Sequence, residues 1–144
     1  MTDNIEIVRD RIADQLGVGW TAGDDFDNNV RHGQELPQDE RTGVPRDCIF
    51  VVPTISPRPQ SFVGGGRSTR FYDTYRIIIR GARYLWDKTY ALAKQVREIL
   101  AGCEFGPFYD VQVLNTLPRQ IPDKKHEKFL IEATFFSNVE EETL

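Results

Sequence analysis

The chain has 144 residues, of which 40% are hydrophobic and 28% are charged, as expected for one folded domain with an ordinary core. Its formal net charge of −4 gives no overall basic footprint for nucleic acid, although eighteen Lys and Arg allow local basic patches. Two cysteines are too few for a disulfide framework. No apolar run approaches the ~20 residues of a membrane span, and the charged N-terminal segment has no signal-peptide core. We therefore expect one soluble domain over residues 1–144, made in the cytoplasm and without a membrane partner.

The N-terminal part of the chain predicts one helix followed by a long loop. Ile5, Val8, Ile12 and Leu16 recur at helical spacing and predict a helix over about residues 4–16, which a left-handed glycine at position 17 would end. Residues 17–47 are rich in Gly, Asp, Asn and Pro and predict an acidic surface loop, with a short strand near residues 29–32.

The rest of the chain predicts four strands around a second helix. The strands cover residues 48–55, 71–81, 109–116 and 128–138, and the helix covers about 85–101. The first strand is a continuous apolar run, typical of a strand that is buried on both sides. The acidic residues 139–144 are expected to fray. The fold class is therefore α+β: a small, mainly antiparallel or mixed sheet of about four strands with two helices packed on it, in the order α-β-β-α-β-β.

Two connections between these strands are unusually long. Residues 56–69 and 117–127 exceed the usual hairpin loop, and loops of such length are typically functional or disordered. They predict two projecting hairpin arms. The sheet face opposite the main core also carries apolar positions, namely Ile78, Leu130 and Phe136, so we expect that face to be covered either by the first helix or by a neighbouring subunit.

No residue pattern indicates catalysis. The glycines at 64–66 lack the Gly-Lys-Ser/Thr ending of a P-loop and precede a strand, so they indicate a flexible arm. His32 and His126 have no partner at metal-ligand spacing, and the charged loop around Asp123 has no nucleophile nearby. We expect no catalytic, metal or cofactor site, and hence a protein that is not an enzyme.

Arginines and aromatic residues alternate around the first long loop, as they do on some surfaces that bind single-stranded nucleic acid. Strand alternation, however, places Tyr75 on the opposite face from Arg76 and Arg80, which argues against one continuous platform. Arginines that are solvated or that contact another subunit are the favoured interpretation, with acidic segments of an adjacent copy as their partners.

The order of elements resembles the tail terminator (tail completion) proteins of tailed bacteriophages. The stretch VVPTISPRPQSFVGGGRSTRFYDTYRIIIRG, a helix ending EILAG, and YDVQVLNTLPRQIPDKKHEKFLIEATFFSN carry this resemblance over residues 48–138. The matching features are an apolar strand, a Pro-rich run to a glycine turn, an Arg-rich bend, a helix, a proline after a strand and an aspartate turn. The apolar strand lies at residues 49–52, the Pro-rich run and glycine turn at 57–66, the Arg-rich bend at 76–83 and the helix at 86–100. The proline is Pro118, and the aspartate of the turn is Asp123.

The resemblance implies a structural protein of the virion, located at the tail–neck junction and made in the host bacterial cytoplasm. Its copies would form a homo-oligomeric ring, by expectation a hexamer, that caps the head-proximal end of the tail tube and joins it to the head–neck connector. Genomic DNA would pass through the ring without sequence-specific binding, which suits an acidic chain. Such a ring needs heterologous contacts that close by rotation.

We predict that both arms and the spare sheet face contact neighbouring subunits or the tail tube. The residues predicted for these contacts are Arg58, Phe62, Gly64, Gly65, Gly66, Arg67, Arg70, Arg76, Arg80, Lys124, Lys125, Leu130 and Phe136. Two alternatives stay open: another neck or head-completion protein such as a connector adaptor, and a small α+β module that binds a ligand or nucleic acid.

Overall fold

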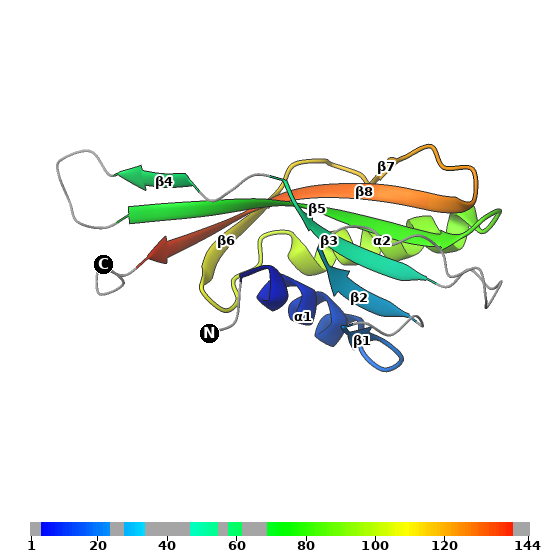
Figure 1. The fold of residues 1–144 in the computed structure, drawn as a ribbon, viewed down its shortest axis with the longest axis horizontal. Helices are drawn as coiled ribbons and strands as arrows, with labels where there is room; N and C mark the ends of the chain where they lie inside the picture. The colour runs from blue at the N-terminus through cyan, green and yellow to red at the C-terminus, as the bar shows by residue number, and fades with distance from the viewer. Residues whose placement is uncertain (1–3, 24–27, 34–46, 55–57, 62–68, 140–144) are drawn as a thin grey trace.

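The computed structural model describes residues 4–23, 28–33, 47–54, 58–61 and 69–139. Figure 1 shows two helices lying along one face of a long, twisted sheet. The elements in chain order are α1 (Asn4–Leu16), β1 (Thr21–Ala22), β2 (Asn29–His32), β3 (Cys48–Pro53), β4 (Arg58–Ser61), β5 (Thr69–Ala82), α2 (Trp86–Leu100), β6 (Phe108–Val113), β7 (Arg119–Gln120) and β8 (His126–Val139).

The predicted α+β class with a mixed sheet is confirmed, but the sheet is larger than expected. In the described part of the chain the sheet has eight strands: the four main strands that were predicted, the short strand predicted near residues 29–32, and three more. Six of them follow the order β1-β2-β3-β5-β8-β6, while β4 pairs with β5 and β7 pairs with β8. The pairs β1–β2 and β2–β3 are parallel and the others are antiparallel. The additional strands have two to four residues each, too few for a period-two pattern to be recognised.

Both helices pack on the same face of the sheet. The apolar stripe of α1 (Val8 and Ile12) and that of α2 (Val96 and Leu100) join one buried cluster with Ile77 and the alternate residues of the neighbouring strands. The expectation that the first helix covers the opposite face is therefore wrong. The core face spans several strands and is too wide for the 15-residue α2 alone, so α1 lies beside α2 and covers the remainder.

The opposite face, which we call the open face, has a small buried patch of its own. Phe50, Ile78 and Leu130 are cross-strand neighbours on β3, β5 and β8, and the Arg80 guanidinium lies 4.8 Å from the centroid of the Phe50 ring. Phe50 and Leu130 are only 1% and 4% exposed. As predicted, β3 is thus buried on both sides along most of its length.

Residues 17–47 are not only a surface loop, as the sequence suggested. The short strand near residues 29–32 is confirmed, and it forms the parallel partner of β3. Asn29 is fully buried: its amide donates to the Gly23 carbonyl at 2.9 Å, and its side-chain oxygen accepts the Cys48 thiol at 3.2 Å. This strand is polar by composition, and only its long-range pairing buries it. Residues 24–27 and 34–46 lie outside the described part.

The second of the two long connections is joined to the sheet edge by the two-residue strand β7. Arg119 and Gln120 pair with Leu130 and Phe129 of β8, and Pro118 before them is buried. The segment therefore folds back along β8 and does not project as a free arm. The first connection does contain a hairpin, since β4 pairs with the beginning of β5; residues 62–68 between them lie outside the described part.

Candidate functional site

The most unusual geometric feature is a pair of long strands. β5 and β8 have 14 residues each and are paired along their whole length, from Thr69 opposite Val139 to Ala82 opposite His126. Fourteen residues of strand span about 40 Å. The two helices cover only part of that length. At one end β4, residues 69–72 of β5 and residues 136–139 of β8 continue beyond the helices (Figure 1); we call these segments the ribbon extension.

An aromatic row lies on the open face where the ribbon extension leaves the body of the domain. Tyr72 and Phe136 are cross-strand partners with ring centroids 6.2 Å apart, and Tyr109 lies 6.3 Å from Phe136 on the other side. All three are half-buried. Aromatic rings that stay partly exposed on a paired sheet surface are typical anchor residues of protein interfaces.

The predicted contact residues are spread over the molecule. Phe62, Gly64, Gly65, Gly66 and Arg67 lie outside the described part of the chain, while Arg58 and Arg70 lie in the strands of the ribbon extension. Arg76 is exposed on the open face, opposite Glu132. Arg80 and Leu130 are 7% and 4% exposed and offer little surface to a neighbour. The predicted contacts themselves remain predictions.

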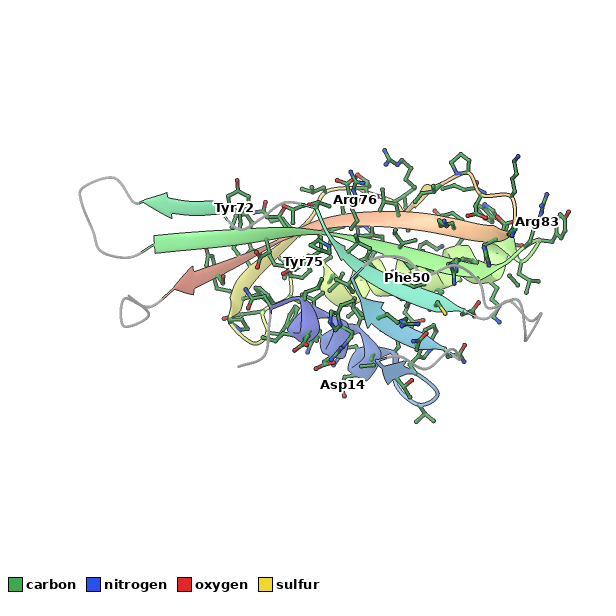
Figure 2. The ribbon with its side chains drawn as sticks, viewed as in Figure 1. Asp14, Phe50, Tyr72, Tyr75, Arg76 and Arg83 are labelled. Carbon is green, nitrogen blue, oxygen red and sulfur yellow. The ribbon has the colours of Figure 1, made fainter. Side chains whose placement is uncertain are left out.

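The strand alternation inferred from the sequence is correct. Tyr75 is buried in the core, whereas Arg76 and Tyr72 lie on the face away from α1 (Figure 2). Arg80 shares the open face with Arg76 but is buried over Phe50. The arginines and aromatic residues of β5 therefore form no continuous platform for stacking bases.

The opposite end of the β5–β8 ribbon carries a second surface feature. The turn from β5 into α2 and the loop between β7 and β8 enclose an open depression of about 560 Å³. Its lining includes Arg83, Tyr84, Ile121, Pro122, Lys124 and Glu127. Arg83 donates a hydrogen bond to the Lys124 carbonyl and thereby ties the turn to the loop. We call this region, together with Lys125, the basic end.

Hydrogen bonds fix the polar side chains around the depression. Glu127 accepts the Tyr84 backbone N–H at 3.1 Å and the Gln120 amide at 3.3 Å, and Gln120 in turn accepts the Trp86 indole N–H at 3.2 Å. Trp86 is stacked on Tyr90 with ring centroids 4.7 Å apart. These hydrogen bonds connect the turn, the start of α2 and the loop that together enclose the depression.

Asp123 organises the loop before β8. Its carboxylate accepts the backbone N–H groups of Lys125 and His126 at 2.7 and 3.0 Å and pairs with Lys128 Nζ at 2.9 Å. Although partial burial opposes the shift, these hydrogen bonds hold the pKa of Asp123 far below its usual range. The neighbouring His126 is buried, and its burial and the Arg80 charge lower its pKa. Asp123 partly opposes that shift.

Tyr84, at the turn from β5 into α2, has an unusual backbone conformation. Its φ of +71° lies in the left-handed region, which costs a non-glycine residue about 1–2 kcal/mol. Its side chain is 81% exposed, with the Arg83 guanidinium 4.9 Å from the ring centroid. Strained residues of this kind concentrate at functional sites. No sequence signal indicates the strain, because tyrosine gives no hint of a positive φ.

The described residues give no geometric basis for metal chemistry. In the parts of the chain that the structure describes, no group of three or more His, Cys, Asp or Glu side chains is placed to hold a metal ion. The Cys48 thiol is buried, and burial raises its pKa. Neither α1 nor α2, the helices described, is long and apolar enough to cross a lipid bilayer.

Comparisons with known proteins identify no family. No protein-family model matches the chain, and no curated protein matches it. Among solved structures, the chain is similar to a chain of the "Virion of native gene transfer agent (GTA) particle", with 11% sequence identity and a TM-score of 0.48. The alignment covers 92% of this chain and 90% of that chain. At this identity and TM-score the similarity assigns neither a family nor a function.

Proposed function

We propose that this chain is a structural virion protein of a tailed bacteriophage, and specifically a tail terminator. Its copies form a ring, expected to be a hexamer, that caps the head-proximal end of the tail tube and joins it to the head–neck connector. The role requires binding surfaces and no catalytic group. The observation that carries the proposal is the ribbon extension, supported by the sequence resemblance over residues 48–138.

The ribbon extension suits contact between copies because its strands have free edges and a partly exposed aromatic row. Within the described residues, Asn138 and Val139 of β8 pair only with β5, and β4 pairs only with β5. Unpaired strand edges bind extended segments of a partner, or they must be shielded. A projecting element that contacts a different surface on the next copy generates a heterologous interface, which closes into a ring when the rotation permits.

The charge of the chain is compatible with a ring through which DNA passes. A net charge of −4 gives no general attraction for phosphates, so DNA would not be retained electrostatically. On the open face, Arg76 lies opposite Glu132, and Arg119 Nη2 is 4.0 Å from Glu132 Oε1. Alternating charges of this kind are suited to contacts between proteins.

The experiment is a tube-capping assay on tubes assembled from the tail tube protein, with ring formation followed by native mass spectrometry and negative-stain imaging. The double substitution Tyr72→Ser/Phe136→Ser should abolish capping and ring formation while the chain remains folded by circular dichroism. Leu114→Ser, at an apolar residue 58% exposed and outside the ribbon extension, is the matched control and should cap normally. Deletion of Gly64, Gly65 and Gly66, which lie outside the described part, is expected to act like the double substitution.

The outcomes separate this proposal from its nearest alternative. A native chain that forms no ring, even on tubes, and leaves tube elongation unaffected would refute the terminator role. A native chain that binds the portal but not the tube would identify a connector adaptor. Capping by the double variant at the native level would show that the aromatic row is not the contact.

A further inference from the structure

In the part of the basic end that the structure describes, three cations take part in no ion pair. Asp123 is paired with Lys128, and Asp47 is paired with Lys88 at 3.3 Å. Within the described residues, Arg83, Lys124 and Lys125 form no ion pair with a carboxylate. Arg83 and Lys124 line the depression together with Asp123 and Glu127, and Lys125 follows Lys124 in the same loop, although the chain as a whole is acidic.

The matching negative charge follows the other end of the same strand in the sequence. β8 begins at His126, directly after the two lysines, and ends at Val139, directly before three consecutive glutamates at positions 140–142. The 14 residues of β8 separate these two groups by about 40 Å. Glu142 is three residues beyond Val139 and can lie at most about 11 Å from it. Residues 140–142 therefore cannot reach the basic end of their own chain.

We propose that the glutamates at positions 140–142 of one copy bind the depression at the basic end of the next copy, where they contact Arg83, Lys124 and Lys125. The occupant is thus a second copy of this chain. Each copy carries both partners, since Arg83 lies at one end of the β5–β8 ribbon (Figure 2) and residues 140–142 follow directly after β8, which ends at the other (Figure 1). The contact is head-to-tail, the type that a closed ring requires. This inference rests on the proposed function.

The chemistry of the depression matches such a segment. Exposed lysines attract several consecutive carboxylates without requiring one fixed geometry. The planar guanidinium of Arg83 adds N–H donors whose directions are fixed. Lys128 and two backbone N–H donors offset the charge of Asp123, so this carboxylate opposes the segment little. Glu127 accepts only the neutral Tyr84 N–H and Gln120 amide and keeps its charge, so the three unpaired cations face one uncompensated carboxylate. The Tyr84, Ile121 and Pro122 side chains give the depression an apolar wall.

The test is charge exchange in the full-length chain. Lys124→Glu/Lys125→Glu alone and Glu140→Lys/Glu141→Lys alone should each weaken self-association roughly 10- to 100-fold, since several screened ion pairs are reversed. The four substitutions combined restore the native net charge and should restore association. The single substitution Lys124→Glu is compared with Lys94→Glu, because Lys94 is an exposed residue of α2. Both substitutions change the net charge equally, but Lys94→Glu should have no effect on self-association. Sedimentation velocity at low and high salt provides the readout.

A peptide experiment tests the contact even if rings form only on tubes. The peptide NVEEETL, titrated into the full chain, should shift backbone amide resonances of residues 83–86 and 119–128, and the same peptide with glutamines at its three glutamates should not. The inference is overturned if neither peptide shifts these amides, if both do so equally, or if the charge-exchanged chain associates no better than the single-end variants. A short oligonucleotide that shifts these amides at lower concentration than the peptide would overturn it in favour of nucleic acid.

The two proposals fail separately. A native chain that caps tubes as a ring, with association insensitive to charge reversal at either end, would refute this inference and leave the terminator role intact. A native chain that fails to cap tubes refutes the terminator role, whatever the peptide does.

Discussion

The substitution Gly81→Ala tests how closely α2 approaches the sheet. Gly81 lies near the end of β5, opposite Glu127 of β8. A Cβ at this position would overlap Thr89 Oγ1 of α2 and would lie 3.1 Å from Asp47 Oδ1 and 3.2 Å from Thr89 Cβ. Glycine is thus required here for space, because the first turn of the helix occupies the volume that any side chain would need.

The expected cost follows from what must move. Thr89 is 1% exposed, and its hydroxyl donates to the Leu85 carbonyl at 3.0 Å. Relief of the overlap requires either rotation of that hydroxyl, with loss of its hydrogen bond, or displacement of the helix from the core. Overpacking of this kind costs about 1–3 kcal/mol. For a chain of this size, such a loss lowers Tm by about 3–10 °C.

Urea denaturation followed by circular dichroism measures the loss, and a double-mutant cycle assigns it. Thr89→Ala removes the overlapping oxygen, so Gly81→Ala/Thr89→Ala should be more stable than the sum of the two single losses predicts. Native stability in Gly81→Ala, or strict additivity in the cycle, would show that this helix–strand contact does not have the geometry described.

Two further substitutions concern the basic end. Because burial lowers the pKa of His126 from its ordinary value of 6.5, the folded state resists protonation, and native stability should fall as the pH falls from 7 to 5. His126→Gln should flatten this dependence in urea midpoints measured at each pH; an unchanged slope would mean that another group causes it. For Tyr84, with φ +71°, Tyr84→Gly should be more stable than Tyr84→Ala by about 1 kcal/mol, because both remove the ring and only glycine relieves the backbone. Equal thermal stability of the two variants would contradict the strained conformation.

The local elements follow directly from the sequence. The predicted helix at residues 4–16 matches α1, and the predicted helix at about 85–101 contains α2 with one residue to spare at each end. Gly17, expected to end the first helix, and Gly102, which follows the second, have φ values of +87° and +66°. These predictions succeed because helical periodicity and left-handed caps depend on residues within a few positions of one another.

The contacts of the short strands follow from pairing partners that are distant in the sequence. Asn29 is buried because β2 pairs with β3, which follows it by more than ten residues in the sequence. No local pattern indicates that this polar residue lies in the protein interior. Arg119 is likewise joined to the sheet by its pairing with Leu130. The sequence predicts only a short strand near residues 29–32 and none at residues 119–120, because short strands are stabilised by the sheet that receives them and not by their own residues.

The sequence by itself determined the class, the two helices, the alternating faces of β5 and β8, and the absence of a recognisable catalytic motif. Only the tertiary structure decided that both helices share one face, that β5 and β8 form one ribbon about 40 Å long, and that the start and the end of β8 lie at its opposite ends. The physical reason is the range of the interactions. Periodicity and capping act within a turn or two of the chain, whereas packing and charge separation depend on which distant segments the sheet brings together.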